Sequence, residues 1–345
     1  MRSTFANLRS LRPSLPFSIA LSLSTLRIQV RWDHDSETLF YSIGDKANVE
    51  KMISFPGKDS LYKAVAKLPR LYNAYDVLNG YYLWFRLDRR VTRIVGANYN
   101  TNKNILQMDI TYDCNLRCPA CCRSCSQAPS KDYMSLGQIE RFVQESLRLQ
   151  KKWQYIKLMG GEPTLHPDFM EILDVIRNYR NDHSPGTVIG VMTNRSRSKV
   201  KEIFGRTYDD VNYVTSQKDI HFIESEYYPF NLAPVDFPRL VRMDYSNGCV
   251  IPQYRGLGLN RYGFYICGNG GGIDRIFGFD IGRKSIPASD DPMRDQMRML
   301  CRYCGIFHSY FTKIGTGVRS NLQCSFSWNE AYKIYRLKKP RLTLY

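Results

Sequence analysis

The amino-acid sequence predicts an α/β fold built on a mostly parallel sheet. From residue 105 onward, short apolar runs of strand length alternate with longer segments whose apolar residues recur at helical spacing. Strands that alternate with helices form parallel sheets with right-handed crossovers. The chain has 345 residues, of which 43% are hydrophobic, so it is long enough to bury a large core.

The elements of this sheet follow one another in a regular order. A capping box of Ser135 and Gln138 opens a helix that runs to Gln150, and Asp168-x-x-Glu171 opens a second helix. The third strand is apolar enough to be buried on both faces. The predicted strands are Ile105–Tyr112, Tyr155–Met159, Thr187–Met192 and Val211–Val214.

Two segments precede the sheet. Residues 1–35 are rich in Arg and Ser, and the first 32 of them contain no Asp, Glu or Lys. This composition is typical of an organelle transit peptide, and it is also compatible with a disordered tail. Residues 36–104 carry no recognisable motif, and we expect a small N-terminal element of unknown role.

The charge and the cysteine content limit the classes of function. The net charge is +17, but the basic residues are spread along the chain, so nucleic-acid binding is not favoured. No apolar run reaches the roughly 18 residues of a membrane span. The ten cysteines include tight C-x2-C pairs, which indicate metal ligands in a reducing compartment. We expect a cytoplasmic protein, with organelle import as the alternative.

A C-x3-C-x2-C loop of Cys114, Cys118 and Cys121 follows the first predicted strand. Three thiolates can hold three irons of a [4Fe–4S] cube and leave the fourth iron open to an exogenous ligand. An open metal position indicates chemistry, whereas closed metal sites are typically structural.

Two further motifs also fall at strand ends. Gly160-Gly161-Glu162-Pro163 follows the second strand and Thr193-Asn194 follows the third. The C-terminal ends of parallel strands gather on one face of an α/β barrel, so the three motifs should converge in space. Glycines without side chains let the backbone approach a ligand closely.

The three motifs together resemble the radical S-adenosylmethionine (radical SAM) superfamily. The resemblance implies a partial (β/α)6 TIM-like barrel over residues 105–235, with a [4Fe–4S] cluster on the cysteine loop and S-adenosylmethionine on its open iron. In this family the cosubstrate is cleaved reductively, and the 5'-deoxyadenosyl radical abstracts hydrogen from a substrate, here a peptide or small metabolite. An electron donor such as flavodoxin or ferredoxin is also implied.

The same resemblance implies roles for the residues at the strand ends. The backbone of Gly160, Gly161, Glu162 and Pro163 would contact the methionine amino group. Thr193 and Asn194 would contact the ribose or the methionine carboxylate. The sequence departs from the family at Ala120, where an aromatic residue often lies near the adenine.

A second cysteine set lies downstream in residues 236–345. Cys249, Cys267, Cys301 and Cys304 could saturate a second [4Fe–4S] cluster, and the region resembles the twitch or SPASM-type extension of radical SAM enzymes. A four-cysteine zinc site is the alternative, because ligand type alone does not separate the two metals. A hairpin is predicted to turn at residues 261–263.

Other residues receive no chemical role. Cys122 and Cys125 are given no firm role, with a packed thiol near the site as the default, and Cys324 is interpreted as a small buried residue. The run Gly268–Arg275 could approach a cluster closely, cradle an anion through Arg275, or form a flexible turn. No catalytic acid or base stands out. The histidines 166, 221 and 308 lack metal-ligand spacing.

Two other functions remain open from the sequence. One is a zinc-stabilised module that binds nucleic acid. The other is an iron–sulfur electron-transfer protein that does not bind S-adenosylmethionine.

Overall fold

The protein is described from a computed structural model that divides into two compact units, residues 1–79 and residues 80–345. In the first unit the structure describes the backbone of four strands. In the second it describes residues 82, 85–118, 121–194, 200, 202–203, 208–215, 230–237, 243–307 and 324–345. The division between the units falls between Asn79 and Gly80 in the sequence, and the expected domain ranges 1–35, 36–104, 105–235 and 236–345 stay predictions.

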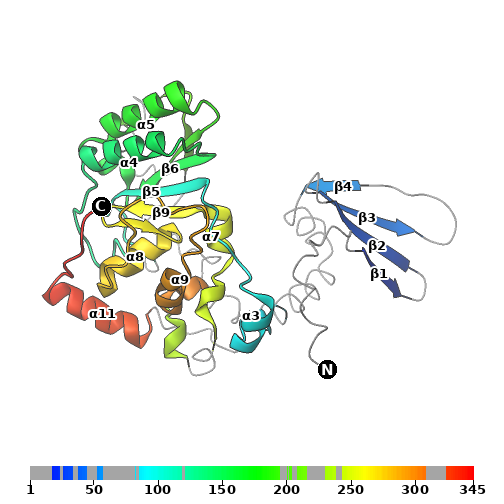
Figure 1. Ribbon diagram of the computed structural model, residues 1–345. Helices are drawn as coiled ribbons and strands as arrows, with labels where there is room; N and C mark the ends of the chain where they lie inside the picture. The colour runs from blue at the N-terminus through cyan, green and yellow to red at the C-terminus, as the bar shows by residue number, and fades with distance from the viewer. Residues whose placement is uncertain are drawn as a thin grey trace, which may run out of the picture. The chain divides into compact units, whose positions relative to one another are not determined.

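The first unit contains an antiparallel four-stranded sheet in the order β1-β2-β3-β4 (Figure 1). Its strands are β1 (Ser18–Leu23), β2 (Leu26–Asp33), β3 (Thr38–Gly44) and β4 (Ile53–Pro56). Both β1 and β2 lie within residues 1–35, for which the sequence predicts a disordered or targeting-like segment. Leu26–Trp32 alternates apolar and polar residues, which is the strand pattern that the Arg/Ser composition obscured. A targeting role stays a prediction.

The second unit is built on an open six-stranded sheet in the order β10-β9-β5-β6-β7-β8. All pairings are parallel except that between β9 and β10. This open, mostly parallel sheet confirms the predicted α/β class and the partial TIM-like architecture. Its strands are β5 (Ile105–Thr111), β6 (Tyr155–Gly160), β7 (Val188–Thr193), β8 (Asn212–Thr215), β9 (Leu257–Asn260) and β10 (Gly263–Tyr265).

The strand β9 joins the C-terminal region to the predicted barrel. β9 pairs in parallel with β5, with Leu106 opposite Leu257 and Met108 opposite Leu259. The six-stranded sheet therefore contains strands from both sides of residue 235. The predicted hairpin is confirmed, because β9 and β10 are antiparallel and are joined by residues 261–262.

Helices cover the sheet and support its connections. Figure 1 shows α4 and α5 on one side of the sheet and α8 on the other. Both halves of the capping box predicted for α4 are present, whereas the Asp168 side chain makes no cap bond to α5. The α-helices of this unit are α3 (Arg89–Val95), α4 (Leu136–Arg148), α5 (Phe169–His183), α7 (Val250–Arg255), α8 (Gly268–Phe277), α9 (Arg294–Leu300) and α11 (Phe326–Leu337). The 3₁₀ helices are η1 (Pro163–Leu165), η2 (Pro234–Asp236), η3 (Tyr245–Asn247) and η4 (Cys301–Tyr303).

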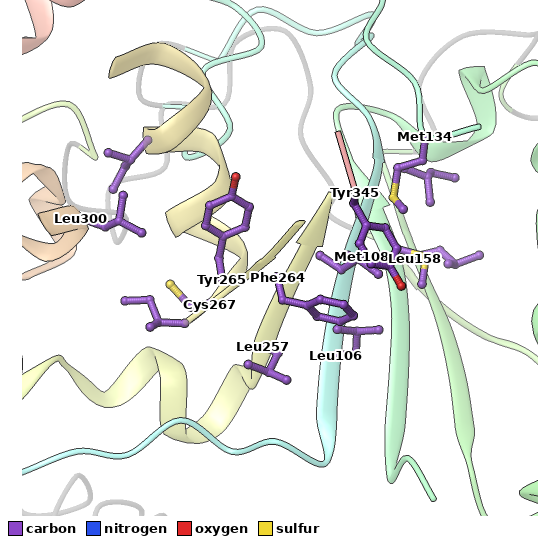
Figure 2. Packing of buried hydrophobic residues seen from close by; sticks show 14 of the residues in the cluster. Leu106, Met108, Met134, Leu158, Leu257, Phe264, Tyr265, Cys267, Leu300 and Tyr345 are labelled. Carbon is purple, nitrogen blue, oxygen red and sulfur yellow. The ribbon is translucent and has the colours of Figure 1, made fainter. Parts of the chain in front are cut away.

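The main core lies around β5 (Figure 2). Leu106 and Met108 of β5 are completely buried, as are Leu158 of β6 and Phe264 of β10. Burying an apolar side chain of this size contributes about 1.5–3 kcal/mol, so these strands form a rigid base for the loops at their ends. In the described ranges, no helix has both the length and the apolar character to cross a bilayer.

Candidate active site

The cysteine loop begins at Cys114, three residues after the end of β5. Cys114, Cys118 and Cys121 are each half-buried. Burial raises the pKa of Cys114 to about 12, and charge on Cys121 and Cys118 adds to this effect. The backbone N–H of Leu116 donates to Cys114 Sγ at 3.5 Å, and this hydrogen bond lowers the pKa of Cys114. Cys118 and Cys121 are therefore near enough to Cys114 to influence its pKa.

The Glu162 carboxylate joins the ends of β6 and β7. Its side chain has no exposed surface. Oε1 accepts hydrogen bonds from Thr164 Oγ1 at 2.7 Å and from Thr193 Oγ1 at 2.8 Å. Oε2 accepts from the backbone N–H of Asn194 at 2.7 Å. Charged acceptors make stronger hydrogen bonds than neutral ones, so this carboxylate fixes the two strand ends relative to each other.

Two further contacts bring the cysteine loop to the same place. Asn194 Nδ2 donates to Asn115 Oδ1, within the loop, at 2.7 Å. The N–H groups of Gly161 and Glu162 donate to the carbonyl oxygens of Thr111 and Asp113, both at 2.8 Å. The predicted convergence of the three motifs is confirmed.

The two glycines are required by this close packing. Gly160 has φ of +134°, and a Cβ there would lie 2.1 Å from the Thr111 carbonyl oxygen. A Cβ on Gly161 would lie 2.0 Å from the Asp113 carbonyl oxygen and 3.1 Å from Cys114 Cβ. Real Cβ atoms do not approach backbone oxygens so closely. Glycine here lets the end of β6 lie directly against the cysteine loop.

Cys125, which had no predicted role, contacts the cysteine loop. A hydrogen bond between the Cys125 and Cys121 thiols lowers the pKa of Cys121, and the same bond raises the pKa of the buried Cys125. The sequence spacing of these cysteines does not predict the contact between Cys121 and Cys125, because the contact depends on the turns that the chain makes within residues 121–128.

A buried cation lies behind the loop. Arg123 Nε is 3.2 Å from Asp109 Oδ2, and both side chains are almost fully buried. Arg123 Nη1 donates to Cys122 Sγ and to Asn269 Oδ1, both at 2.9 Å. Burial works to lower the pKa of Arg123, but the charges of Asp109 and Cys122 outweigh it and raise the pKa. Arg123 therefore stays cationic and ties the loop to β5 and α8.

The second cysteine set is gathered around one small cavity. Cys249, Cys267, Cys301 and Cys304 all line it. Burial raises the pKa of each of the four thiols, that of Cys304 to about 12, and neighbouring thiols of the set add to it for Cys249, Cys301 and Cys304. Cys122 also acts on the pKa values of Cys267 and Cys304, so it lies on the side of the loop that faces this set.

The donor set suits a soft metal or an iron–sulfur cluster. In the described part of the chain, no three His, Cys, Asp or Glu side chains are arranged to hold a single metal ion. Iron–sulfur and zinc both stay open as occupants of the second set.

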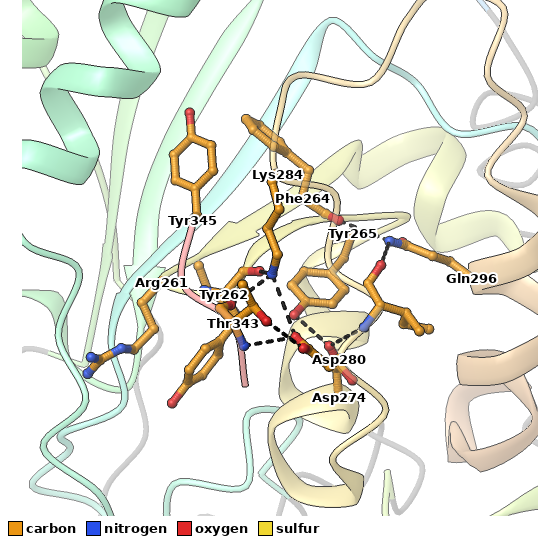
Figure 3. Close-up of polar contacts among 12 residues, drawn as sticks. Arg261, Tyr262, Phe264, Tyr265, Asp274, Asp280, Lys284, Gln296, Thr343 and Tyr345 are labelled. Carbon is orange, nitrogen blue, oxygen red and sulfur yellow. Dashed lines mark hydrogen bonds and ion pairs between the residues drawn. The ribbon is translucent and has the colours of Figure 1, made fainter. Parts of the chain in front are cut away.

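A hydrogen-bond network positions this second set (Figure 3). Gln296 of α9 accepts from the Ile266 N–H at 2.9 Å. Its Nε2 donates to the Phe264 carbonyl oxygen at 3.0 Å, as Figure 3 shows. The Tyr265 hydroxyl donates to Asp274 Oδ2 at 2.8 Å. The end of β10, which leads into Cys267, is thereby fixed to α8 and to the helix that leads into Cys301.

The glycine-rich run forms the first half of α8, so the flexible-turn interpretation is wrong. A Cβ on Gly268 would lie 2.3 Å from Arg123 Nη2, and one on Gly272 would lie 3.0 Å from the Cys122 carbonyl oxygen. The glycines therefore serve close helix packing. Arg275 does not cradle an anion.

The Arg275 side chain is instead buried in the protein. It donates to the Ala128, Arg123 and Ser124 carbonyl oxygens and to the Tyr335 hydroxyl. These bonds hold the segment that follows the cysteine loop against α8 and α11.

Of the remaining expectations, two are tested. His166 is buried, with Nε2 2.8 Å from the Met134 carbonyl oxygen, as expected for a packed histidine. Cys324 is only half-buried. Ala120, His221 and His308 lie outside the described residues.

Comparisons with known proteins agree on one family. The family model described as "Radical SAM superfamily" matches residues 108–212. A "Probable GTP 3',8-cyclase" of Thermococcus kodakarensis is 32% identical over 125 residues, which cover 36% of this chain and 36% of that protein. The "Mycofactocin maturase MftC" of Mycobacterium ulcerans is 36% identical over 69 residues, or 20% of this chain and 18% of that protein.

This chain therefore spans about a third or less of the length of these two relatives. Among solved structures, "BtrN in complex with AdoMet and 2-DOIA" matches with a TM-score of 0.37 and 13% identity, covering 59% of this chain and 89% of that one.

Proposed function

Because the chain belongs to the radical SAM superfamily through residues 108–212, we propose that it is an enzyme that cleaves S-adenosylmethionine reductively. Cys114, Cys118 and Cys121 would hold the [4Fe–4S] cluster that this family uses. Three thiol ligands leave one iron for the amino and carboxylate groups of the cosubstrate. When bound together, cluster and cosubstrate supply a 5'-deoxyadenosyl radical that abstracts hydrogen.

The observation that carries this proposal is the convergence at Glu162. Its buried carboxylate bonds Thr193 and Asn194, and Asn194 in turn bonds Asn115 of the cysteine loop. A metal-binding loop with a structural role alone would not need two other strand ends to be fixed beside it. Such an arrangement suits a ligand that extends from the loop across the ends of β6 and β7.

The chain's own residues would bind this ligand in two ways. The N–H groups of Gly161 and Glu162 already donate within the protein, so the turn would meet an amino group through its carbonyl oxygens. Pro163 has no N–H and begins η1, which fixes where the turn ends. Thr193 and Asn194 would hold Glu162 in place and present acceptor atoms to the ribose hydroxyls.

We also propose that the second cysteine set binds a second [4Fe–4S] cluster, which would pass electrons or anchor the substrate. A flavodoxin or ferredoxin would supply the electrons. The relatives' names indicate GTP for one and mycofactocin for the other, so we propose only a small metabolite or a peptide as substrate. No described residue is assigned as a catalytic acid or base.

The first experiment separates cleavage from mere cluster binding. The full-length protein is reconstituted anaerobically, reduced in the presence of S-adenosylmethionine, and assayed for 5'-deoxyadenosine. Cys118→Ala should abolish this product, because two thiolates cannot hold the cluster in its reactive form. Cys324→Ala, a cysteine outside both sets, should retain nearly all of it. Wild-type activity in Cys118→Ala would refute the assignment, and an iron-loaded protein that forms no 5'-deoxyadenosine would favour an electron carrier.

The second experiment tests the downstream set. The double variant Cys301→Ala/Cys304→Ala should lose about four irons per chain relative to the wild type, the content of one cube. Metal analysis of both proteins provides the measurement. Loss of zinc with unchanged iron would instead assign the set to a structural zinc site.

A further inference from the structure

A cavity of about 480 Å³ lies apart from both cysteine-lined sites and is strongly basic. Its lining includes Arg89 and Arg93 of α3, Arg298 of α9 and Arg302 of η4. Among the described residues of the lining, Asp244 is the only one with a carboxylate. Arg89, Arg93 and Arg298 are exposed, and Arg302 is half-buried. We propose that this cavity binds a small molecule bearing a diphosphate or an equivalent set of phosphate groups.

The described residues that line the cavity carry an excess of positive charge. Four guanidinium groups and one carboxylate leave three positive charges. Among the described residues, Asp244 forms no ion pair with these arginines, and its Oδ1 accepts from the N–H and the hydroxyl of Ser246, at 3.0 and 2.6 Å.

Within the described ranges, none of the four arginines forms an ion pair, whereas Arg283 pairs with both Asp291 and Asp295. Like charges gathered without counter-charges repel one another, and a polyanion would relieve this repulsion.

One arginine of the cavity lining has a nitrogen that is already buried from solvent. Arg302 Nε is buried and has no hydrogen-bond partner among the described atoms. Tyr245 also lines the cavity, and burial raises its pKa to about 12, so its phenol stays neutral.

Phosphate is the anion that suits this arrangement. Guanidinium forks bind phosphate oxygens in pairs, and arginine is preferred over lysine where such planar recognition is needed. The cavity volume falls in the range of roughly 300–1,000 Å³ that is typical of small-molecule sites. A single carboxylate ligand would neutralise only one of the three surplus charges.

The cavity is attached to the second cysteine set through the chain. Arg302 lies between Cys301 and Cys304, and Arg298 lies one turn earlier on α9. A ligand held by these two arginines would contact the segment that positions two thiols of that set. The proposal does not depend on the radical SAM assignment, because it concerns binding to the cavity alone.

The test is calorimetric titration of the full-length protein with inorganic pyrophosphate at low ionic strength. The double variant Arg89→Gln/Arg93→Gln and the single variant Arg298→Gln should each raise Kd at least tenfold. Arg90→Gln is the matched control, since Arg90 is an exposed neighbour on α3 that does not line the cavity. Its Kd should stay within twofold of the wild type, and thermal melts should show that all variants fold.

Three results would overturn the proposal. One is no binding of pyrophosphate by the wild type at millimolar concentration. The second is equal weakening in Arg90→Gln, which would indicate only the general basic charge of the chain. The third is citrate binding as tightly as pyrophosphate, which would assign the cavity to carboxylates.

Discussion

The carboxylate of Glu162 holds the candidate active site together at the scale of single residues. It has no exposed surface and accepts hydrogen bonds from Thr164, Thr193 and Asn194. The family resemblance gave this motif a role through its backbone contacts with the cosubstrate. The side chain has a separate role, which is to fix the third motif beside the first.

Replacing this carboxylate by an amide should weaken the whole site. In Glu162→Gln one oxygen becomes a donor that faces another donor, which should lower the free energy of unfolding by about 1–3 kcal/mol. The yield of 5'-deoxyadenosine should fall as well. Urea denaturation and the product assay measure the two effects. Glu140→Gln, on the exposed face of α4, should change stability by less than about 0.5 kcal/mol. Similar losses in both variants would contradict the role given to Glu162.

Among the secondary-structure elements, the contact between α5 and the entry to β8 depends on charge. Arg177 of α5 makes two hydrogen bonds to Asp210, both at 3.1 Å, and Arg180 also pairs with it. The hydrogen bonds from Arg177, with the charges of both arginines, lower the pKa of Asp210. The Asp210 side chain is 42% exposed, so solvent screening limits what this pair contributes.

The pair should make the stability of this edge depend on pH. A carboxylate whose pKa is lowered by folding contributes stability above its unfolded pKa and loses it as the pH falls through its folded pKa. Asp210→Asn should therefore cost at most about 1 kcal/mol at pH 7. The difference from the wild type should shrink as the pH is lowered below about 4. Urea denaturation across this pH range tests it, with the exposed Asp209→Asn as control. A difference that stays constant with pH would exclude the ion pair as its cause.

How much of each element could be predicted depends on how local its signal is. The capping box of Ser135 and the apolar runs of β5, β6 and β7 are local patterns, and the structure confirms them within one or two residues. The helical state of Gly268–Phe277 is not local. Glycines within a helix disfavour it. The glycines of α8 are explained by the close approach of Arg123 and Cys122 to this helix, which leaves no room for side chains.

The site shows the same limit. The motif residues could be found because each follows a predicted strand, whereas the contact of Cys125 with Cys121 and the burial of Arg275 needed the folded chain. The basic cavity combines arginines from α3, α9 and η4, and about 200 residues of sequence separate α3 from the other two helices. No sequence pattern joins positions so distant.

At the scale of the whole molecule, the division at residues 79 and 80 indicates that the second unit has its own core. All candidate site residues and the basic cavity belong to it. A compact unit with its own hydrophobic core can fold alone.

A chain reduced to residues 80–345 should therefore fold and retain both proposed clusters. Its iron content and its yield of 5'-deoxyadenosine should match those of the full-length protein, and circular dichroism should show a cooperative thermal transition. An uncooperative melt, or loss of iron, would show that residues 1–79 are needed for the fold of the second unit.

The pairing of β9 with β5 also has a consequence for how the protein is made. During translation the cysteine loop leaves the ribosome long before β9 and α8. In the folded protein β9 pairs with β5, and α8 supplies Asn269, to which Arg123 donates. Until those later residues are synthesised, β5 has an unpaired edge, and the loop's thiols are accessible to oxidants. We expect that a nascent chain needs protection of this edge, and that iron is inserted only after release.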